Sequence, residues 1–282
     1  MSGASANPEA GDSFRMTQPS VQANNYDRVA HLYDSTRGLS AEAEREVGDG
    51  LAAILAEYGA RTVLEVGVGT GRIAVPLAER GFQVTGIDIS TEMLRSLRAK
   101  RADIRLLLAE SSGLPFRAGS FDAVVFSHIL HLVPDSAATI RAAIACVRRG
   151  GLLLNCSHSY APYPQQRAGD RLNEIIREVT GHAGWIHGHR ASAEPVLAEV
   201  LADFGATLET REIAHWTDVN TLRREVARLE LRANSNTWAI PDDAMPIIVE
   251  RFTAEALEIF GGLDVESQAL ARFMVNIATL AE

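Results

Sequence analysis

The sequence predicts an α/β fold built on a parallel sheet, and two observations carry this prediction. From residue 61 onward, short apolar segments alternate with segments of helical periodicity, a pattern that produces parallel strands joined by right-handed crossovers. The first apolar segment also runs directly into a glycine-rich stretch that opens a helix. The strands expected on this basis are 61–66, 83–88, 104–108, 121–126 and 151–157, and the helices between them are 71–80, 91–101 and 135–148.

The regions on either side of this block are less regular. Residues 24–58 show helical periodicity in two pieces, and Gly59 ends the second piece. After residue 158 the pattern predicts helices at 170–179 and 194–204, then strands at 206–216 and 272–280. The segment 218–262 reads as helical with interruptions at Pro241 and Pro246.

Composition excludes several classes of protein. Of the 282 residues, 46% are hydrophobic and 22% are charged, which supports a packed core rather than disorder. The net charge of −9, without a basic and aromatic run, disfavours nucleic acid and anionic membrane as partners. Apolar runs fall short of the roughly 20 residues of a transmembrane helix, and the first 25 residues lack the pattern of a secretory signal. We therefore expect a cytoplasmic protein.

Cysteine and lysine usage narrows the chemistry further. Cys146 and Cys156 both fall in apolar stretches, so we expect neither a disulfide scaffold nor a cysteine zinc site. Lys100 is the only lysine and lies on a predicted surface helix. A mechanism that depends on a lysine Schiff base is therefore disfavoured.

A glycine-rich loop follows the first predicted strand. Gly67, Gly69 and Gly71 stand at alternate positions, and glycine lets the backbone turn sharply while a ligand approaches the main chain. The dinucleotide pattern G-x-G-x-x-G would need its third glycine at residue 72, where this chain has arginine. The loop therefore suits the pyrophosphate bridge of a dinucleotide less well. The alternative that the loop is only a structural turn stays open.

An acidic residue ends the second predicted strand. Asp88 lies 21 residues after Gly67, at a place where a carboxylate accepts hydrogen bonds from both hydroxyls of a ribose. The alternative is that Asp88 caps the helix that begins near Thr91, although Ser90 is also a suitable N-cap. The loop and the acid together favour a nucleoside ligand.

These features, with others, resemble the class I S-adenosylmethionine-dependent methyltransferases of the small-molecule group. The loop matches the family's first motif, and Asp88 matches its ribose-binding acid. Segment 108–116 resembles the family's Gly-Asp-Ala-x-x-Leu-Pro-Phe, and segments 121–126, 149–153 and 26–38 match the fourth strand, the turn into the fifth and a leader helix. The resemblance covers residues 24–158 and implies a Rossmann-like, mostly parallel sheet of seven strands. Helices flank this sheet, and the N-terminal helices and inserts form a helical lid.

The resemblance also implies a division of the chain and a cofactor site. We expect a flexible leader at 1–23, a helical cap at 24–58, a core that binds S-adenosylmethionine at 59–158, and substrate-pocket inserts with the closing strands at 159–282. The residues implied to contact the cofactor are Tyr33, Arg37, Glu65, Gly67, Gly69, Gly71, Asp88, Ile89, Met93, Glu110, Ser111 and Ser127. Glu110 departs from the usual aspartate by one methylene, and core or surface packing stays open for Met93, Tyr33 and Arg37.

Methyl transfer from a sulfonium is an in-line displacement that mainly requires alignment and the exclusion of water. A general base helps when the acceptor atom carries a proton, and His128 and His131 follow the fourth predicted strand beside the expected methyl group. A purely structural role stays open for both histidines. His182, His187 and His189 form a second histidine cluster, for which substrate contact, metal binding and a polar surface loop all stay open; we predict no metal.

The substrate is expected to contact segments 159–193 and 218–262, where aromatic residues gather. This skew suits an apolar or aromatic small molecule, although it also fits the core of a helical lid. The candidate substrate residues are Tyr160, Trp185, His187, His189, Trp216 and Trp238. Arg223, Arg228 and Arg232 are better explained by intrahelical pairs with Glu225 and Glu230 than by an acidic substrate.

The sequence thus predicts an enzyme that methylates an oxygen, carbon or nitrogen atom of a small metabolite, as a monomer or homodimer. An enzyme of the same fold that holds the cofactor structurally and catalyses a cyclisation or rearrangement is the first alternative. A non-catalytic binding protein is the second, but the intact cofactor motifs disfavour it.

Overall fold

A sheet of seven strands organises the chain, of which the computed structural model describes residues 26–37, 39–161, 166–181, 193–234, 237–238 and 240–281. The strand order is β3-β2-β1-β4-β5-β7-β6, in which β7 pairs antiparallel with both of its neighbours and the other pairs are parallel. The strands are β1 (Thr62–Val66), β2 (Gln83–Asp88), β3 (Arg105–Leu108), β4 (Phe121–Ser127), β5 (Val147–Tyr160), β6 (Thr207–Asn220) and β7 (Ser267–Thr279). The predicted Rossmann-like fold class is confirmed.

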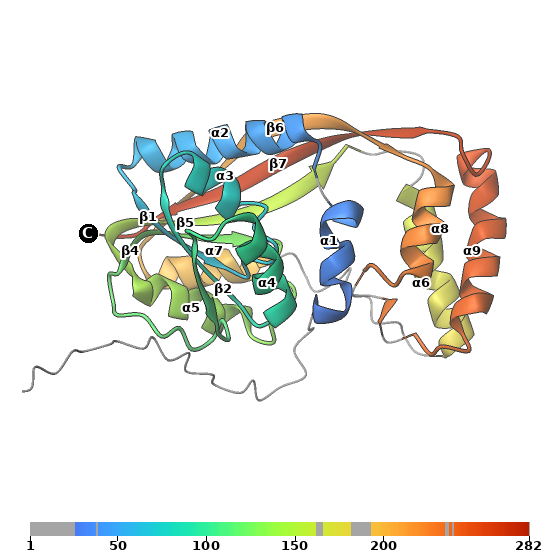
Figure 1. Cartoon of the computed structure of the whole chain (residues 1–282), viewed down its shortest axis with the longest axis horizontal. Coiled ribbons are helices and arrows are strands. Elements are labelled where there is room, and N and C mark those ends of the chain that lie inside the picture. The colour runs from blue at the N-terminus through green and yellow to red at the C-terminus, as the bar shows by residue number, and fades with distance from the viewer. Residues whose placement is uncertain are drawn as a thin grey trace, which may run out of the picture.

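Helices cover both faces of the sheet (Figure 1). One face packs against α2 (Ala41–Glu57), α3 (Ala74–Glu79) and α4 (Thr91–Lys100), and the other packs against α5 (Ser136–Cys146) and α7 (Ala193–Asp203). The N-terminal segment also forms a short 3-10 helix, η1 (Tyr26–Val29), and α1 (Ala30–Arg37). Of the two helical pieces predicted at 24–58, α2 therefore belongs to the core layer, while α1 lies beside the end of the sheet.

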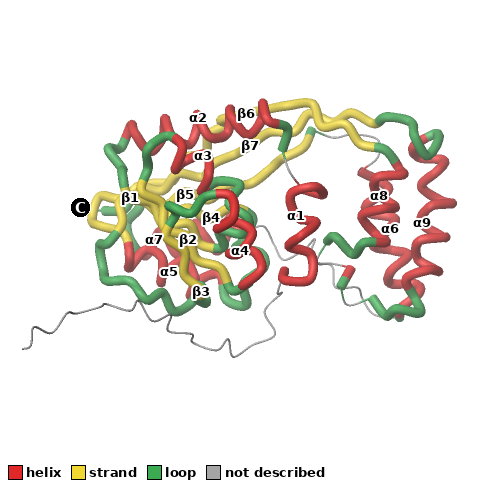
Figure 2. The backbone as a smooth tube through the Cα atoms, in the orientation of Figure 1, coloured by secondary structure: helices red, strands yellow, loops and turns green. Residues whose placement is uncertain are grey.

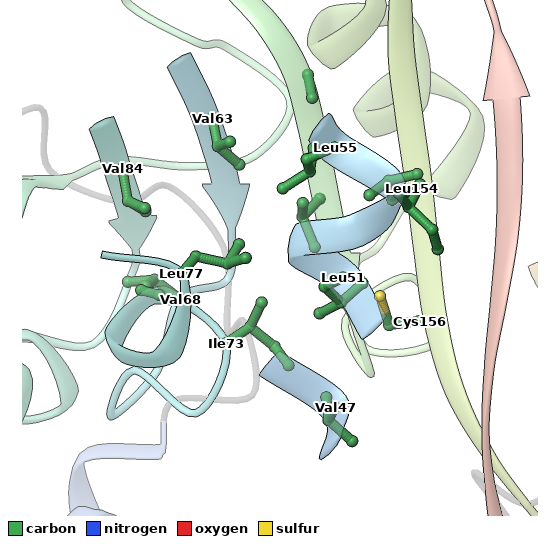
Figure 3. Close-up of a cluster of buried hydrophobic side chains, with 14 of the residues drawn as sticks. Val47, Leu51, Leu55, Val63, Val68, Ile73, Leu77, Val84, Leu154 and Cys156 are labelled. Atoms are coloured by element: carbon green, nitrogen blue, oxygen red, sulfur yellow. The ribbon is translucent and has the colours of Figure 1, made fainter. Parts of the chain in front are cut away.

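Strand periodicity explains the two cores. Successive side chains of a strand point to opposite faces, so Val63 joins the layer under α2 while Leu64 joins the layer under α5. Figure 3 shows the first layer, where Leu51 and Leu55 of α2 meet side chains of the sheet such as Leu154. Both faces of the central strands are buried, and this accounts for the nearly continuous apolar character of segments 63–66 and 123–126.

Helix starts follow the capping residues that the sequence offers. Ser90 accepts a hydrogen bond from the backbone N–H of Met93 at 3.1 Å, which confirms it as the N-cap of α4. The helix predicted at 71–80 is shorter than expected, because α3 begins only at Ala74. Pro76 thereby falls in the first turn, where a backbone N–H has no intrahelical acceptor to lose.

The last three strands of the sheet are longer than predicted. β5 was expected at 151–157 and β6 at 206–216, but they run to Tyr160 and Asn220, and β7 begins at Ser267 rather than at 272. The helix expected from 218 is therefore wrong over its first three residues. The cause is pairing between distant segments, since β6 and β7 hydrogen-bond along their whole lengths, from Thr207 beside Thr279 to Asn220 beside Ser267.

The extended strands lead to a separate group of three helices (Figure 2). α6 (Gln166–Thr180), α8 (Leu222–Glu230) and α9 (Met245–Phe260) pack around their own buried cluster, which includes Ile175, Leu229 and Phe252. In Figure 1, α1 lies between this helical group and the sheet. No helix among the described residues has both the length and the apolar character needed to cross a membrane.

Replacement of Gly71 by alanine should destabilise the chain through a steric clash. Gly71 has φ of +91°, and a Cβ atom there would lie 2.3 Å from Cδ1 of the fully buried Leu97. Gly81 has a similar φ of +88° but open space around its Cβ position, so Gly81→Ala is a matched control for backbone strain. Urea unfolding should show Gly71→Ala losing about 1–3 kcal/mol more stability than the control. Equal losses would show that Leu97 is free to move aside.

Candidate active site

A pocket of about 620 Å³ opens at the carboxyl ends of the parallel strands. It lies where the strand order reverses between β1 and β4, which is the usual ligand position in open α/β sheets. Its walls come from the loops after β1, β2, β3 and β4, from α1, and from the extended ends of β5 and β6 with α8. The volume falls within the roughly 300–1,000 Å³ typical of cofactor and small-molecule sites.

The glycine loop forms one wall with its backbone. The N–H groups of Gly67 and Val68 both donate to the carbonyl oxygen of Ile87 at 2.9 Å, which ties the loop to the end of β2. Gly67 and Gly69 have φ of +73° and +53° and line the pocket, and a Cβ on Gly69 would meet open space. Gly71 does not line the pocket, because its position is needed for close packing on α4.

Asp88 holds this loop from the neighbouring strand. Its Oδ2 accepts the N–H of Gly69 at 2.8 Å and its Oδ1 accepts the N–H of Ser90 at 2.9 Å. Burial raises the pKa of the carboxyl, and the backbone N–H groups oppose that rise. The N–H of Ile89 also donates to the carboxylate, so of its roughly four lone-pair sites one stays free, and the side chain faces the pocket. Asp88 can thus both fix the loop and accept a ligand hydroxyl.

Other predicted cofactor residues gather around the same end of the pocket. Ser111 Oγ lies 3.0 Å from Thr139 Oγ1, which ties the loop after β3 to α5. The remaining members of this group come from the ends of β2 and β4 and from α4. Glu110 lies on the same loop as Ser111. The residues that line the pocket here are Ile89, Met93, Glu110, Ser111 and Ser127.

Glu65 is placed differently from the other predicted cofactor residues. It is 2% exposed on β1, does not line the pocket, and its Oε2 has no hydrogen-bond partner among the described residues. The N–H of Ala74 donates to the carboxyl group. Burial raises the pKa of Glu65 well above its ordinary value, and the positive charge of Arg72 opposes this. In this structure Glu65 therefore contacts the start of α3 instead of the pocket.

The short helix α1 closes one side of the pocket through polar contacts. Asp34 accepts a hydrogen bond from Thr70 Oγ1 at 2.6 Å and pairs with Lys100 at 2.6 Å, so the single lysine anchors α1 to the core. Arg228 of α8 donates to the carbonyl oxygen of Thr36 at 2.6 Å from the other side. These contacts hold Tyr33 at the pocket wall. The side chain of Arg37 lies outside the described part of the structure.

Histidine and aromatic rings form the other end of the pocket. His128 directly follows β4 and has φ of +53°, an uncommon backbone conformation for a residue other than glycine. The ring of His158, on β5, lies 4.4 Å from that of His128 and 5.3 Å from that of Trp216, both edge to face. The predicted residues that line this end are His128, His131, Tyr160 and Trp216.

The sequence interpretation missed His158, although a signal was present. Leu152, Leu154 and Cys156 all face the first core layer, so strand alternation carries His158 onto the same face at the carboxyl end of β5. Burial, with a smaller contribution from the positive charge of Arg72, lowers the pKa of His158 from 6.5 to about 3. His158 is therefore neutral at physiological pH.

The remaining candidates differ in where the structure places them. Trp238 is not among the lining residues and packs instead against Tyr26, with ring centroids 4.8 Å apart, so it supports a ring that does line the pocket. Arg228 lines the pocket and pairs with Glu225 on its own helix at 3.0 Å, as the sequence indicated. The intrahelical pairs expected for Arg223 and Arg232 are wrong, because Arg223 pairs with Asp264 and Arg232 with Asp242. Trp185, His187 and His189, with His182, lie outside the described residues.

Comparison with known proteins agrees with this geometry. Residues 64–155 match the family model of a methyltransferase domain. The chain is 27% identical over 215 residues to a demethylmenaquinone methyltransferase of Renibacterium salmoninarum, a match that covers 74% of this chain and 83% of that protein. A ubiquinone biosynthesis O-methyltransferase of Xanthomonas campestris pv. campestris is 38% identical over 111 residues, which cover 37% of this chain and 46% of that protein.

The chain belongs to the class I S-adenosylmethionine-dependent methyltransferases. It is an enzyme of the small-molecule group, and its cofactor is S-adenosylmethionine. It spans less than half the length of the second relative, so the similarity there concerns the shared domain. Among solved structures, the [4+2]-cyclase SpnF superposes with a TM-score of 0.55 at 18% identity, covering 91% of this chain and 94% of that one. A likeness at that identity shows the fold alone.

The residues present fit this cofactor. The open space above Gly69 allows a ligand to approach the backbone, and the Asp88 carboxylate beside it has free capacity for a hydroxyl group. The absence of a third glycine at residue 72 agrees with a single nucleoside rather than a dinucleotide.

Asp88→Asn should weaken cofactor binding, because an amide presents one acceptor oxygen in place of two. We expect the dissociation constant for S-adenosylmethionine, measured by equilibrium dialysis, to rise by about ten- to a hundredfold, which corresponds to roughly 1.4–3 kcal/mol. Asp103→Asn is the matched control, since this exposed carboxylate pairs with Arg101 at the surface. An unchanged constant for Asp88→Asn in a folded protein would remove Asp88 from the site.

His158→Phe should make the protein less sensitive to acid. Native His158 stays neutral down to about pH 3, whereas in the unfolded chain it takes up a proton near pH 6.5. Falling pH therefore favours the unfolded state, by up to about 1.4 kcal/mol per pH unit within this window. Thermal unfolding between pH 7 and 4.5 should show a shallower loss of stability for His158→Phe.

The control is His215→Phe, at an exposed position on β6. If stability falls equally steeply with pH in wild type and in His158→Phe, the lowered pKa of His158 is contradicted.

Proposed function

We propose that this enzyme transfers the methyl group of S-adenosylmethionine to an oxygen, carbon or nitrogen atom of a small, apolar or aromatic metabolite. One observation carries the proposal: a single pocket joins the Asp88 and glycine-loop end to an end lined by His128, His158 and Trp216. A direct transfer requires that the two ligands lie end to end in one enclosed space. The quinone-pathway names of the two curated relatives support an aromatic acceptor.

The residues of the chain supply binding, alignment and shielding. Asp88 and the backbone of Gly67 and Gly69 would hold the nucleoside and the amino-acid part of the cofactor, which supplies an electrophilic methyl group on a sulfonium. α1, anchored through Asp34, covers the pocket and excludes water. The aromatic end of the pocket would position the acceptor for in-line attack.

A proton has to leave when the acceptor is a hydroxyl or an amine. His128 and His131 both line the pocket and are the candidate general bases. His158 is a weaker base, because its pKa is held near 3. Carbon or phenolate acceptors that enter already ionised would not need a base at all.

The test is a transfer assay with labelled S-adenosylmethionine and a panel of hydroquinones, phenols and aromatic amines. We expect S-adenosylhomocysteine to form in step with a product that is 14 mass units heavier than its acceptor. Product formation without S-adenosylhomocysteine would indicate instead the cyclisation or rearrangement alternative. Tight cofactor binding with no conversion of any acceptor in the panel would contradict the proposed substrate class.

His128→Gln and His131→Gln test the base. With a hydroxyl acceptor, at least one of the two variants should lower kcat by about a hundredfold or more, while cofactor affinity changes less than twofold. The control is His31→Gln, on the exposed face of α1. If both variants retain wild-type kcat across pH 6–9, general-base catalysis by these histidines is excluded.

A further inference from the structure

His158 is enclosed by aromatic rings from two strands and from the residue that follows a third. His128 directly after β4, Trp216 of β6 and Phe273 of β7 surround its imidazole, with ring centroids at 4.4, 5.3 and 5.2 Å. His158 and Phe273 lie directly opposite each other in the antiparallel β5–β7 ladder. The ring is therefore held firmly by its packing, in one orientation beside the pocket.

The imidazole is unsatisfied in this position. Its Nε2 is buried and has no hydrogen-bond partner among the described residues. Buried polar atoms are normally hydrogen-bonded, and a buried group left unpaired destabilises the folded state. A phenylalanine would fill the same space without that cost, so packing alone does not explain a histidine here.

The other ring nitrogen, Nδ1, is the one left for a ligand. His158 lines the pocket, and Nδ1 is not one of the buried unpaired atoms. A neutral imidazole offers a single hydrogen bond at this nitrogen and no charge, which suits a hydroxyl group better than a carboxylate. The nearby positive charge of Arg72 favours an oxygen on which negative charge develops.

We propose that His158 is a specificity-determining residue that hydrogen-bonds the hydroxyl group of a flat aromatic acceptor through Nδ1. Trp216 and His128 provide the aromatic surfaces on which the ring of the acceptor packs, and such contacts favour planar over saturated rings. The acceptor class is therefore a phenol or naphthol rather than an aliphatic alcohol or a carboxylic acid. This inference rests on the proposed function and specifies the acceptor end of the same pocket.

The experiment measures binding rather than turnover. Wild type, His158→Phe and His215→Phe are saturated with S-adenosylhomocysteine, and the affinities of 1-naphthol, naphthalene and decahydro-1-naphthol are measured by equilibrium dialysis. Wild type and His215→Phe should bind 1-naphthol about tenfold more tightly than either of the other probes. In His158→Phe the preference for 1-naphthol over naphthalene should disappear, while the affinity for naphthalene changes less than twofold.

A second variant controls for disturbed packing. His158→Asn carries a donor and an acceptor close to the position of Nδ1, so it should keep part of the preference that His158→Phe loses. A wild type that binds the three probes equally overturns the proposal, and so does a His158→Phe that keeps the full preference for 1-naphthol. If wild type fails to bind S-adenosylhomocysteine, the proposed function fails instead. Normal cofactor binding with an unchanged probe preference in His158→Phe refutes only the role of His158.

Discussion

The antiparallel pairing of β5, β7 and β6 is the constraint on which the rest of the molecule depends. The ladder begins in the core, where Leu152 lies opposite Thr279, and continues past the parallel strands until Tyr160 lies opposite Ala271. The same ladder completes the sheet, carries the chain to the α6, α8 and α9 group, and places His158 and Trp216 above the pocket. The acceptor end of the site is therefore built on rigid sheet, and its geometry is set by backbone hydrogen bonds.

The cofactor end depends on a smaller set of polar contacts. Asp88 connects the end of β2 to Gly69, and two aspartates, Asp27 and Asp34, connect η1 and α1 to the core. Asp27 accepts hydrogen bonds from Ser90 Oγ and from the N–H of Glu92. These bonds attach η1 to the start of α4. The two ends of the site thus differ in construction, with sheet at one and hydrogen-bonded loops and short helices at the other.

Local patterns made the parallel half of the fold predictable, because each strand and helix between 61 and 157 shows its own periodicity. The glycine loop and Asp88 were also recognisable, since their chemistry follows from spacing within one β-α-β unit. The lengths of β5, β6 and β7 were not, because they are fixed by pairing between residues that lie 47 to 127 positions apart in the sequence. His158 was missed for the same reason: the polar residues around it suggested the end of a strand, whereas pairing with Phe273 carries the strand onward.

The most direct test of this account is a calorimetric titration of the wild-type chain with S-adenosylmethionine and, separately, with NADH. Both ligands suit an open α/β sheet, but one contains a single nucleoside and the other is a dinucleotide, for which Arg72 stands in place of the third glycine. The account predicts one S-adenosylmethionine per chain with a dissociation constant in the micromolar range and no measurable binding of NADH. A folded chain that binds NADH, or that binds neither ligand, would contradict it.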